Sequence, residues 1–207
     1  MSHLCGRRAA LLLVLSVATV SCGSAATSEV ATTQALVSTS TSSTSTTTTT
    51  ATPDQGLLPQ TSAKPNGSGA HLSSDVSLLW NAIVTGDPQI ADPFFFPLSA
   101  YIQVKAISNP VHDYDTRLIY AYDTDLLLYH QELMKMGGAP KLMGLSIPKN
   151  QAQWVLPGAE YNKGSYWRVY GSKLYFSVDG ITHHFPIDSL ISWRGQWYVV
   201  HVGPPTS

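Results

Sequence analysis

Hydrophobic residues recur with a helical period soon after residue 70. Ser73 or Ser74 is predicted to cap the first helix, and Gly86 with Pro88 is predicted to end it. The apolar residues spaced by three and four positions are Val76, Leu79, Trp80, Ile83 and Val84. Such a stripe must pack against another element, so this helix is expected to cover part of a hydrophobic core.

Two further segments have helical spacing. The first ends at Asn109-Pro110, and its regularly spaced residues are Leu98, Tyr101, Ile102 and Lys105. The second begins at a cap formed by Asp113 or Asp115 and ends at Gly137-Gly138. Its apolar side comprises Leu118, Ile119, Tyr122, Leu126, Tyr129 and Leu133. The three phenylalanines within 92–97 are predicted to fill a core corner rather than bind a ligand, and residues 139–150 are predicted to be a connection.

From Trp154 to Val202 the pattern changes from helical to alternating, which predicts strands. The alternating runs are 154–156, 166–170, 173–178, 181–187, 190–193 and 196–202. Asp179-Gly180 lies between two of these runs and is a strong hairpin signal. A two-residue loop there pairs Val178 with Ile181 and Phe176 with His183, and it also pairs Leu174 with Phe185.

Strands joined by such short turns must be antiparallel, because a parallel return needs a long crossover. The predicted fold class is therefore α+β, with two or three helices packed on a four- to six-stranded antiparallel meander. The order of helices followed by a sheet is also similar to the cystatin and NTF2-like plans. That similarity is an alternative description of the fold and implies no chemistry.

The N-terminus has the features of a secretory signal. Arg7 and Arg8 precede twelve uncharged residues, 9–20, which would span only about 18 Å as a helix and therefore disfavour a transmembrane segment. The sequence Thr19-Val20-Ser21-Cys22 resembles the lipobox of bacterial lipoproteins, with Thr19 in place of the usual Leu, Val or Ile. The resemblance implies that Cys22 is acylated, for example with palmitate, and becomes the new N-terminus. The alternative is ordinary signal cleavage near residues 24–26.

The cysteine content agrees with that interpretation. The chain has two cysteines, Cys5 within the signal and Cys22 at its end, so an exported domain contains no disulfide. A single cysteine kept at the end of the apolar segment is best explained by chemistry at its thiol. We therefore predict that Cys22 is the lipidation site.

The composition changes after Cys22. Residues 23–70 are dominated by Ser, Thr, Ala, Gly and Pro, with thirteen consecutive Ser or Thr residues in 38–50. Such a segment cannot bury enough apolar surface to offset its ordering entropy, so a disordered stalk is predicted, either O-glycosylated or unmodified. The expected organisation is a signal peptide in 1–21, a lipidated N-terminus and stalk in 22–70, and a globular domain in 71–207. Limited proteolysis is expected to stop between residues 65 and 75.

The charge of the chain excludes some partners. Charged residues make up 12% of its 207 residues and the net charge is −1, whereas a nucleic-acid binder needs a large positive field. We therefore expect a membrane partner through the lipid anchor, together with a cell-wall component or envelope protein, and no nucleic acid. The expected location is the extracytoplasmic face of a bacterial cell membrane, with secretion as the alternative.

Three histidines in the strand region are candidates for metal binding. The hairpin register directs His183 and His184 to opposite faces, so they cannot share a metal ion. His201 is expected on the face of Trp197 and Val199, near His183 if their strands are neighbours. Hydrogen-bonded core histidines are favoured over a zinc site. A zinc site needs three or four converging ligands, and the spacing of the potential ligand residues does not indicate such a set.

Motifs for catalysis are weak. Ser146 and Lys149 match S-x-x-K, but Pro148 lies between them and no partner motif follows, so the match is interpreted as coincidence. The carboxylates Asp113, Asp115, Asp123 and Asp125 form a loose group around Tyr114 and Arg117 that capping and solvation explain as well as acid–base work. No catalytic, cofactor-binding or metal-binding residue is predicted, and no cofactor is expected.

The C-terminal region carries a resemblance. Residues 189–203 read SLISWRGQWYVVHVG and follow GSYWRVYG at 164–171. These segments resemble a group of uncharacterised secreted and lipid-anchored actinobacterial proteins with a recurrent Trp-Arg-Gly-x-Trp-Tyr-Val-Val-His ending. The resemblance runs from near Phe96 to Gly203. It implies an extracytoplasmic location and an actinobacterial source, and it carries over no activity or catalytic residue.

The sequence thus predicts a lipid-anchored envelope protein that is a non-catalytic binding or interaction module on a flexible stalk. The alternative is a secreted enzyme or small-ligand carrier with a pocket between helices and sheet. A polar cavity lined by Arg168, Tyr175 and His184 would favour the alternative, and a filled interface between helices and sheet would favour the module.

Overall fold

A computed structural model describes residues 54–205. The expected signal peptide, Cys22 and the Ser/Thr-rich run lie outside the described residues, so the structure does not bear on them. No helix in the described part of the chain has the length and apolar character needed to cross a membrane.

The described helices follow the predicted order. They are α1 (Ala70–Thr85), α2 (Leu98–Val104), α3 (Pro110–Asp113) and α4 (Tyr120–Met136). α1 ends at Gly86, which has a left-handed conformation with φ of 71° as a glycine stop requires. Its N-cap is Gly69 rather than the expected Ser73 or Ser74, so those serines lie inside the helix.

The predicted start of the longest helix was wrong. A π-helical segment, Tyr114–Ile119, joins α3 to α4 without a break, so neither Asp113 nor Asp115 is a cap. The cap is Asn109, whose side-chain Oδ1 accepts a hydrogen bond from the His112 amide at 3.2 Å. Asn109-Pro110 therefore starts a helix, because proline is well tolerated at the first helical position.

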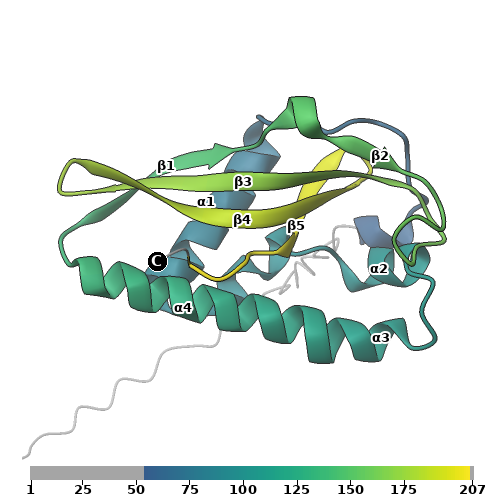
Figure 1. Cartoon of the computed structure of the whole chain (residues 1–207), viewed down its shortest axis with the longest axis horizontal. Coiled ribbons are helices and arrows are strands. Elements are labelled where there is room, and N and C mark those ends of the chain that lie inside the picture. Colours follow the sequence, from purple (N-terminus) through teal and green to yellow (C-terminus); the bar gives the residue numbers. More distant parts are fainter. Residues whose placement is uncertain (1–53, 206–207) are drawn as a thin grey trace, which may run out of the picture. The chain divides into compact units, whose positions relative to one another are not determined.

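The strands form one antiparallel sheet, which confirms the α+β fold (Figure 1). They are β1 (Pro140–Ser146), β2 (Gln153–Val155), β3 (Tyr166–Val178), β4 (Ile181–Trp193) and β5 (Gln196–His201). The order is β1-β3-β4-β5, and β2 also pairs with β3. Helices α1 and α4 lie on one side of this sheet, as Figure 1 shows.

The predicted Asp179-Gly180 hairpin is confirmed residue by residue, with Val178 opposite Ile181, Phe176 opposite His183 and Leu174 opposite Phe185. The predicted break at Gly171 was wrong, because β3 continues through it with a glycine φ of 70°. Buried residues Val169 and Ser172 are three positions apart there, so the alternation of buried and exposed positions changes phase at Gly171.

The expected connection in 139–150 was also wrong, because most of it is the edge strand β1. Pro140 and Gly144 concealed the strand, since both residues are usually depleted in strand interiors. A register shift between Leu142 and Gly144, with a φ of 136° at Gly144, accommodates the glycine as an irregularity. Edge strands tolerate such breaks better than central ones.

Rings fill the interface between the helices and half of the sheet. Trp80 of α1 lies 5.2 Å from Phe176, and Tyr129 of α4 stacks on Phe185 at 4.2 Å between ring centroids. The aromatic corner is confirmed, because Phe94, Phe95 and Phe96 are at most 2% exposed. The Phe96 amide also donates to the Val199 carbonyl at 3.0 Å, so this segment covers the outer edge of β5.

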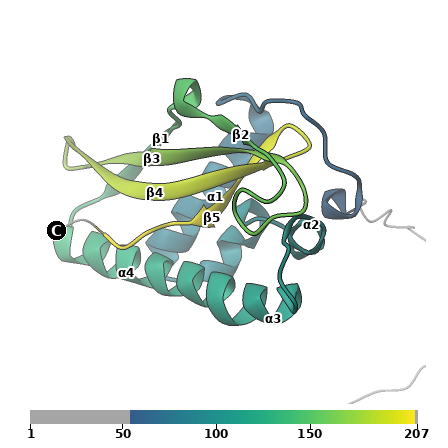
Figure 2. The same cartoon turned by 45° about the vertical axis from the view of Figure 1, so that its right-hand side comes forward.

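The packed region begins before the expected boundary at residue 71. Residues 54–69 run along the domain to α1 and bond to the sheet (Figure 2). The Gln60 side chain donates to the Ser192 carbonyl at 2.8 Å and accepts from the Arg194 amide at 2.7 Å. Trp167 Nε1 donates to the Ser62 carbonyl at 3.0 Å. The end of the expected stalk is therefore part of the fold.

Candidate functional site

The histidines of the central hairpin point to opposite faces, as predicted. His183 lies beside Phe176 and His184 beside Tyr175, both with ring centroids 5.6 Å apart. Among the described residues no group of three His, Cys, Asp or Glu side chains could hold a metal ion.

His201 does not share the face of Trp197 and Val199, contrary to expectation. Leu190 pairs with Val199 and Ser189 with His201, so β5 has one extra residue, Val200, at this point. The bulge places His201 opposite Ser189. Ser189 is six positions along β4 from His183, so His201 and His183 are not neighbours. Both Ser189 and His201 line a pocket that is described below.

The acidic residues are distributed among separate contacts. Asp113 forms an ion pair with Arg117 at 2.6 Å, and Asp125 accepts a hydrogen bond from the Gly203 amide at 3.1 Å. Ser146 ends β1 and Lys149 begins a short 3-10 helix, so the S-x-x-K residues do not share a helical turn.

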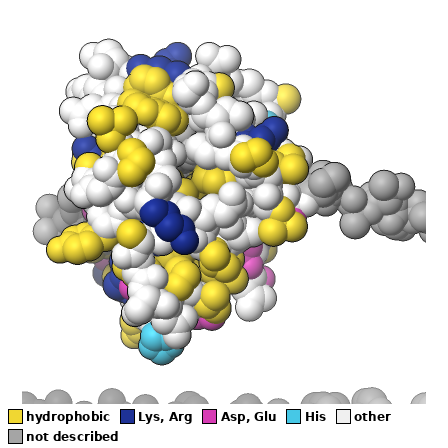
Figure 3. Space-filling model, turned by 90° about the vertical axis from the view of Figure 1, so that its right-hand side faces the viewer, with side chains coloured by type: hydrophobic (Ala, Val, Ile, Leu, Met, Phe, Trp, Pro, Cys, Tyr) yellow, Lys and Arg dark blue, Asp and Glu magenta, His cyan; other side chains and the backbone are white. Residues whose placement is uncertain are grey.

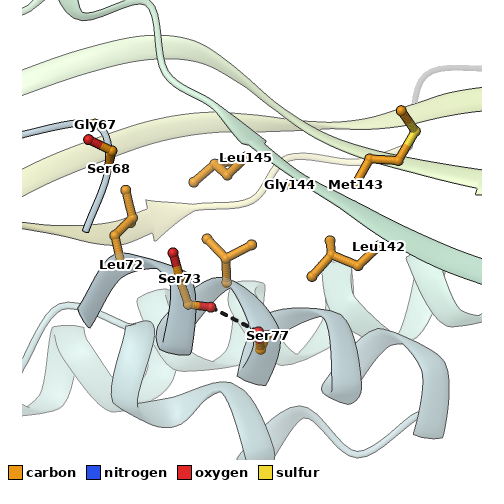
Figure 4. Close-up of a pocket in the computed structure, with 10 residues that line it drawn as sticks. Gly67, Ser68, Leu72, Ser73, Ser77, Leu142, Met143, Gly144 and Leu145 are labelled. Atoms are coloured by element: carbon orange, nitrogen blue, oxygen red, sulfur yellow. Dashed lines mark hydrogen bonds between the residues drawn. The ribbon is translucent and has the colours of Figure 1, made fainter. Parts of the chain in front are cut away.

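A groove lies between α1 and the edge strand β1 (Figure 4). Its volume is about 360 Å³. Figure 4 shows Leu142 and Leu145 directed toward α1 and Met143 directed away from it. Gly67 and Ser68 lie at one end of the groove (Figure 4). The remaining lining residues come from α1 and are Leu72, Ser73, Val76 and Ser77.

This groove, which we call the α1–β1 groove, contains no charged lining residue. It lies beside the outer edge of β1, which pairs with β3 on its other side. No strand covers that outer edge in the described part of the chain, whereas the outer edge of β5 is covered by the segment at Phe96. An uncovered edge presents backbone N–H and C=O groups to a partner.

A second, smaller hollow lies between α2 and the other half of the sheet. It has a volume of about 90 Å³, and we call it the polar pocket. The loop after β2 lies against the end of α2, where the Lys163 amide donates to the Val104 carbonyl at 2.7 Å (Figure 2). The lining residues are Tyr101, Val104, Lys105, Glu160, Tyr166, Arg168, Tyr170, Ser189, Ile191, Val200 and His201.

One wall of the polar pocket is a closed network around Arg168. Its guanidinium forms an ion pair with Glu160, donates to Gln153 Oε1 at 2.9 Å and lies 4.5 Å over the Tyr170 ring. Glu160 also accepts from the Tyr166 hydroxyl at 2.7 Å. Burial raises the pKa of Tyr166 to about 12, so this phenol remains a donor at neutral pH.

Lys105 and His201 also line the polar pocket. Lys105 Nζ donates to the Glu160 backbone carbonyl at 3.1 Å, and Ser189 Oγ shares a hydrogen bond with His201 Nδ1 at 3.0 Å. Burial lowers the pKa of Lys105 and Arg117 lowers it further, while Asp113 acts in the opposite direction. Burial also lowers the pKa of His201.

The lining residue Tyr101 and the neighbouring Arg117 are both bonded to Asp113. Arg117 Nε donates to Asp113 Oδ1 at 2.7 Å, and the Tyr101 hydroxyl bonds to the same carboxylate. The bond to Arg117 holds the pKa of Asp113 below its usual value. Arg117 is therefore already paired with a carboxylate.

The residues expected to mark a ligand pocket are only partly brought together. Arg168 lines the polar pocket, while Tyr175 and His184 contact each other elsewhere on the sheet. Lys105 had one signal in the sequence, because it falls on an otherwise apolar stripe with Leu98, Tyr101 and Ile102. Glu160 had none, since it lies in a loop between strands.

The end of the domain that carries α2 and α3 has mixed chemistry. In Figure 3, hydrophobic and uncharged surface is interrupted by Lys and Arg side chains that stand apart from one another. Comparison with protein-family models, curated proteins and solved structures finds no match to this chain.

Proposed function

We propose that this chain is a lipid-anchored envelope protein whose domain is a non-catalytic binding module for an extended peptide segment of another envelope protein. The segment lies in the α1–β1 groove and pairs with the outer edge of β1. Support for the anchor comes from the sequence alone, namely the lipobox at Cys22 and the resemblance to secreted and lipid-anchored actinobacterial proteins.

The observation that carries the binding proposal is the combination of a groove with an adjoining uncovered strand edge. A peptide added to a sheet edge gains main-chain hydrogen bonds, and alternate side chains enter neighbouring pockets. Here Leu142, Leu145 and Val76 line the groove and offer apolar surface for those side chains. A volume of about 360 Å³ is in the usual range for ligand sites.

The form of β1 also limits what can pair with it. Lys141 is exposed and the register shift lies between Leu142 and Gly144. Charged side chains and bulges restrict indiscriminate pairing at sheet edges. The shift divides β1 into two regular runs of three residues, Pro140–Leu142 and Gly144–Ser146, each about 10 Å long at a rise of about 3.3 Å per residue. The expected occupant is therefore a short strand of uncharged or apolar residues.

Anchoring is tested through Cys22. In cells fed a fatty-acid analogue, the wild-type protein should become labelled and stay with the membrane, whereas Cys22→Ala should be unlabelled and released into the medium. A wild-type protein that takes up no label would refute the anchor.

Docking is tested by photo-crosslinking on intact cells. A photoreactive amino acid at Ser77, which is exposed in the groove, should give one crosslinked protein partner. The same amino acid at Ser74, exposed on the same helix but outside the groove, is the matched control. Ser73→Trp should abolish the Ser77 product by filling the groove. Equal products from both positions, or a glycan as the only product, would contradict a peptide-binding groove.

A small-ligand carrier is a second candidate, and the polar pocket favours it. Groups of both charges converge there with hydroxyls and apolar walls, as ligand sites require.

A further inference from the structure

Lys105 is the cation in the polar pocket that forms no ion pair with a carboxylate in the described part of the chain. The four ion pairs in the described part of the chain involve other residues. Its ammonium has three N–H groups, and one of them donates to the Glu160 backbone carbonyl. The other two have no protein acceptor within residues 54–205. They are available to a ligand at the pocket wall.

The two neighbouring arginines are not available to a ligand in the same way. Arg168 is paired with Glu160 and also bonds to Gln153, and Arg117 is paired with Asp113. The charged lining residues are Lys105, Arg168 and Glu160, which sum to one positive charge. A ligand that carries a single negative charge would neutralise the pocket.

The walls define the rest of the ligand. Val104 and Ile191 are buried apolar lining residues, and Tyr170 is 54% exposed at the mouth. Ser189 and His201 add polar atoms on the sheet side. A volume of about 90 Å³ holds several water-sized groups, since one water needs roughly 10–15 Å³ by this kind of measure. The pocket thus fits a group of a few heavy atoms with both a charged and an apolar part.

We propose that the polar pocket binds a monovalent carboxylate with a short apolar tail. The carboxylate accepts hydrogen bonds from Lys105 Nζ and from the Ser189–His201 pair, and the tail lies against Val104 and Ile191. This site is separate from the α1–β1 groove and does not depend on it, because the two hollows share no lining residue.

The lowered pKa of Lys105 agrees with this assignment. Burial disfavours the charged form of a lysine that lacks a counter-ion. A bound carboxylate supplies the counter-ion, so binding should raise the Lys105 pKa. A hydrogen bond to a charged group contributes about 1.5–3 kcal/mol, which corresponds to roughly a tenfold to hundredfold change in affinity.

The test is an NMR titration of the full chain in neutral-detergent micelles at constant ionic strength. The probes are butyrate, its neutral amide butyramide, and N-acetyl-alanyl-alanine, whose carboxylate ends a peptide. Butyrate should shift the amides of α2 and of residues 189–201 and raise the Lys105 pKa, which is followed at its side-chain carbon. Lys163, which is exposed on the adjoining loop, is the internal control and should not respond.

Variants complete the test. Lys105→Gln should weaken butyrate binding about tenfold or more, whereas Lys163→Gln should leave it unchanged. Saturation by butyrate alone would assign the site to a free small acid, and saturation by the acetylated dipeptide as well would assign it to the end of a longer molecule. Equal shifts from butyrate and butyramide would overturn the proposal. If Lys105→Gln does not fold, an unchanged Lys105 pKa in butyrate-saturated wild-type protein would overturn it as well.

Discussion

The two halves of the β3–β4 hairpin use the same pair of strands for different purposes. In the half near the turn, Leu174, Phe176 and Phe185 are nearly inaccessible and rings from α1 and α4 fill the space over them. In the other half, Arg168 and Ser189 instead line the polar pocket beside α2. The filled half supplies stability, and the pocket half retains charges that a stable core would exclude.

The difference between the filled half and the pocket half coincides with backbone irregularities and not with a change in strand direction, because β3 and β4 remain antiparallel throughout. Gly171 changes the phase of burial on β3, and the extra residue Val200 changes it on β5. Both lie at the junction of the two halves, where Tyr170 pairs with Ser189 and Ser172 with Ile187. The hairpin therefore keeps one register throughout while its buried face changes.

The filled half should be the more sensitive to truncation. Phe176 is fully buried and lies 4.7 Å from Phe185 and 5.2 Å from Trp80 between ring centroids. Phe176→Ala should lower the free energy of unfolding by about 3–5 kcal/mol, because it removes buried area and leaves a cavity. Urea denaturation measures the change. Tyr175→Ala, at a half-buried neighbouring position, should cost clearly less. Equal losses from the two variants would break the comparison.

The junction should respond more weakly. Gly171 has a φ of 70°, and an added Cβ would meet no atom within 4 Å. Gly171→Ala should therefore cost about 1–2 kcal/mol through backbone strain alone. Gly164→Ala, where φ is not left-handed and the nearest atoms are at ordinary contact distance, is the control and should cost less. Urea denaturation again measures both, and a Gly171→Ala protein as stable as the wild type would show that the phase change does not need glycine.

The regular parts of the fold could be predicted because local signals agree with the tertiary structure. The apolar stripe that ends at Gly86 predicted α1, and Asp179-Gly180 predicted the pairing of Phe176 with His183. Failures occurred where a residue that usually ends an element lies inside one. Gly171 lies within β3, and Asn109 starts a helix that was expected to begin later.

The candidate sites were harder to predict, for a physical reason. The α1–β1 groove depends on a strand hidden by Pro140 and Gly144, and the polar pocket depends on a loop that brings Glu160 to Lys105. Contacts between residues 55 positions apart leave no periodic trace in a sequence. The bulge at Val200 reversed the expected face of His201, because one inserted residue redirects all that follow.

The smallest expected effect is the pH dependence of stability that His201 gives to the pocket half. Burial lowers the pKa of His201 from its usual 6.5, with Arg117 and Lys105 acting in the same direction and Asp188 against them. The unfolded chain then binds a proton more readily than the folded one, so His201 costs little stability well above pH 6.5. The loss of stability grows as the pH falls from about 6.5 towards the lowered folded pKa, and it is complete below that value. Relative to His201→Gln, the wild-type protein should lose stability between pH 7.5 and pH 5, as urea denaturation at the two values would measure. Groups such as Asp188 are common to both proteins and cancel in the difference. If the difference in free energy of unfolding between wild type and His201→Gln is the same at both pH values, the pocket half does not disfavour the charged imidazole.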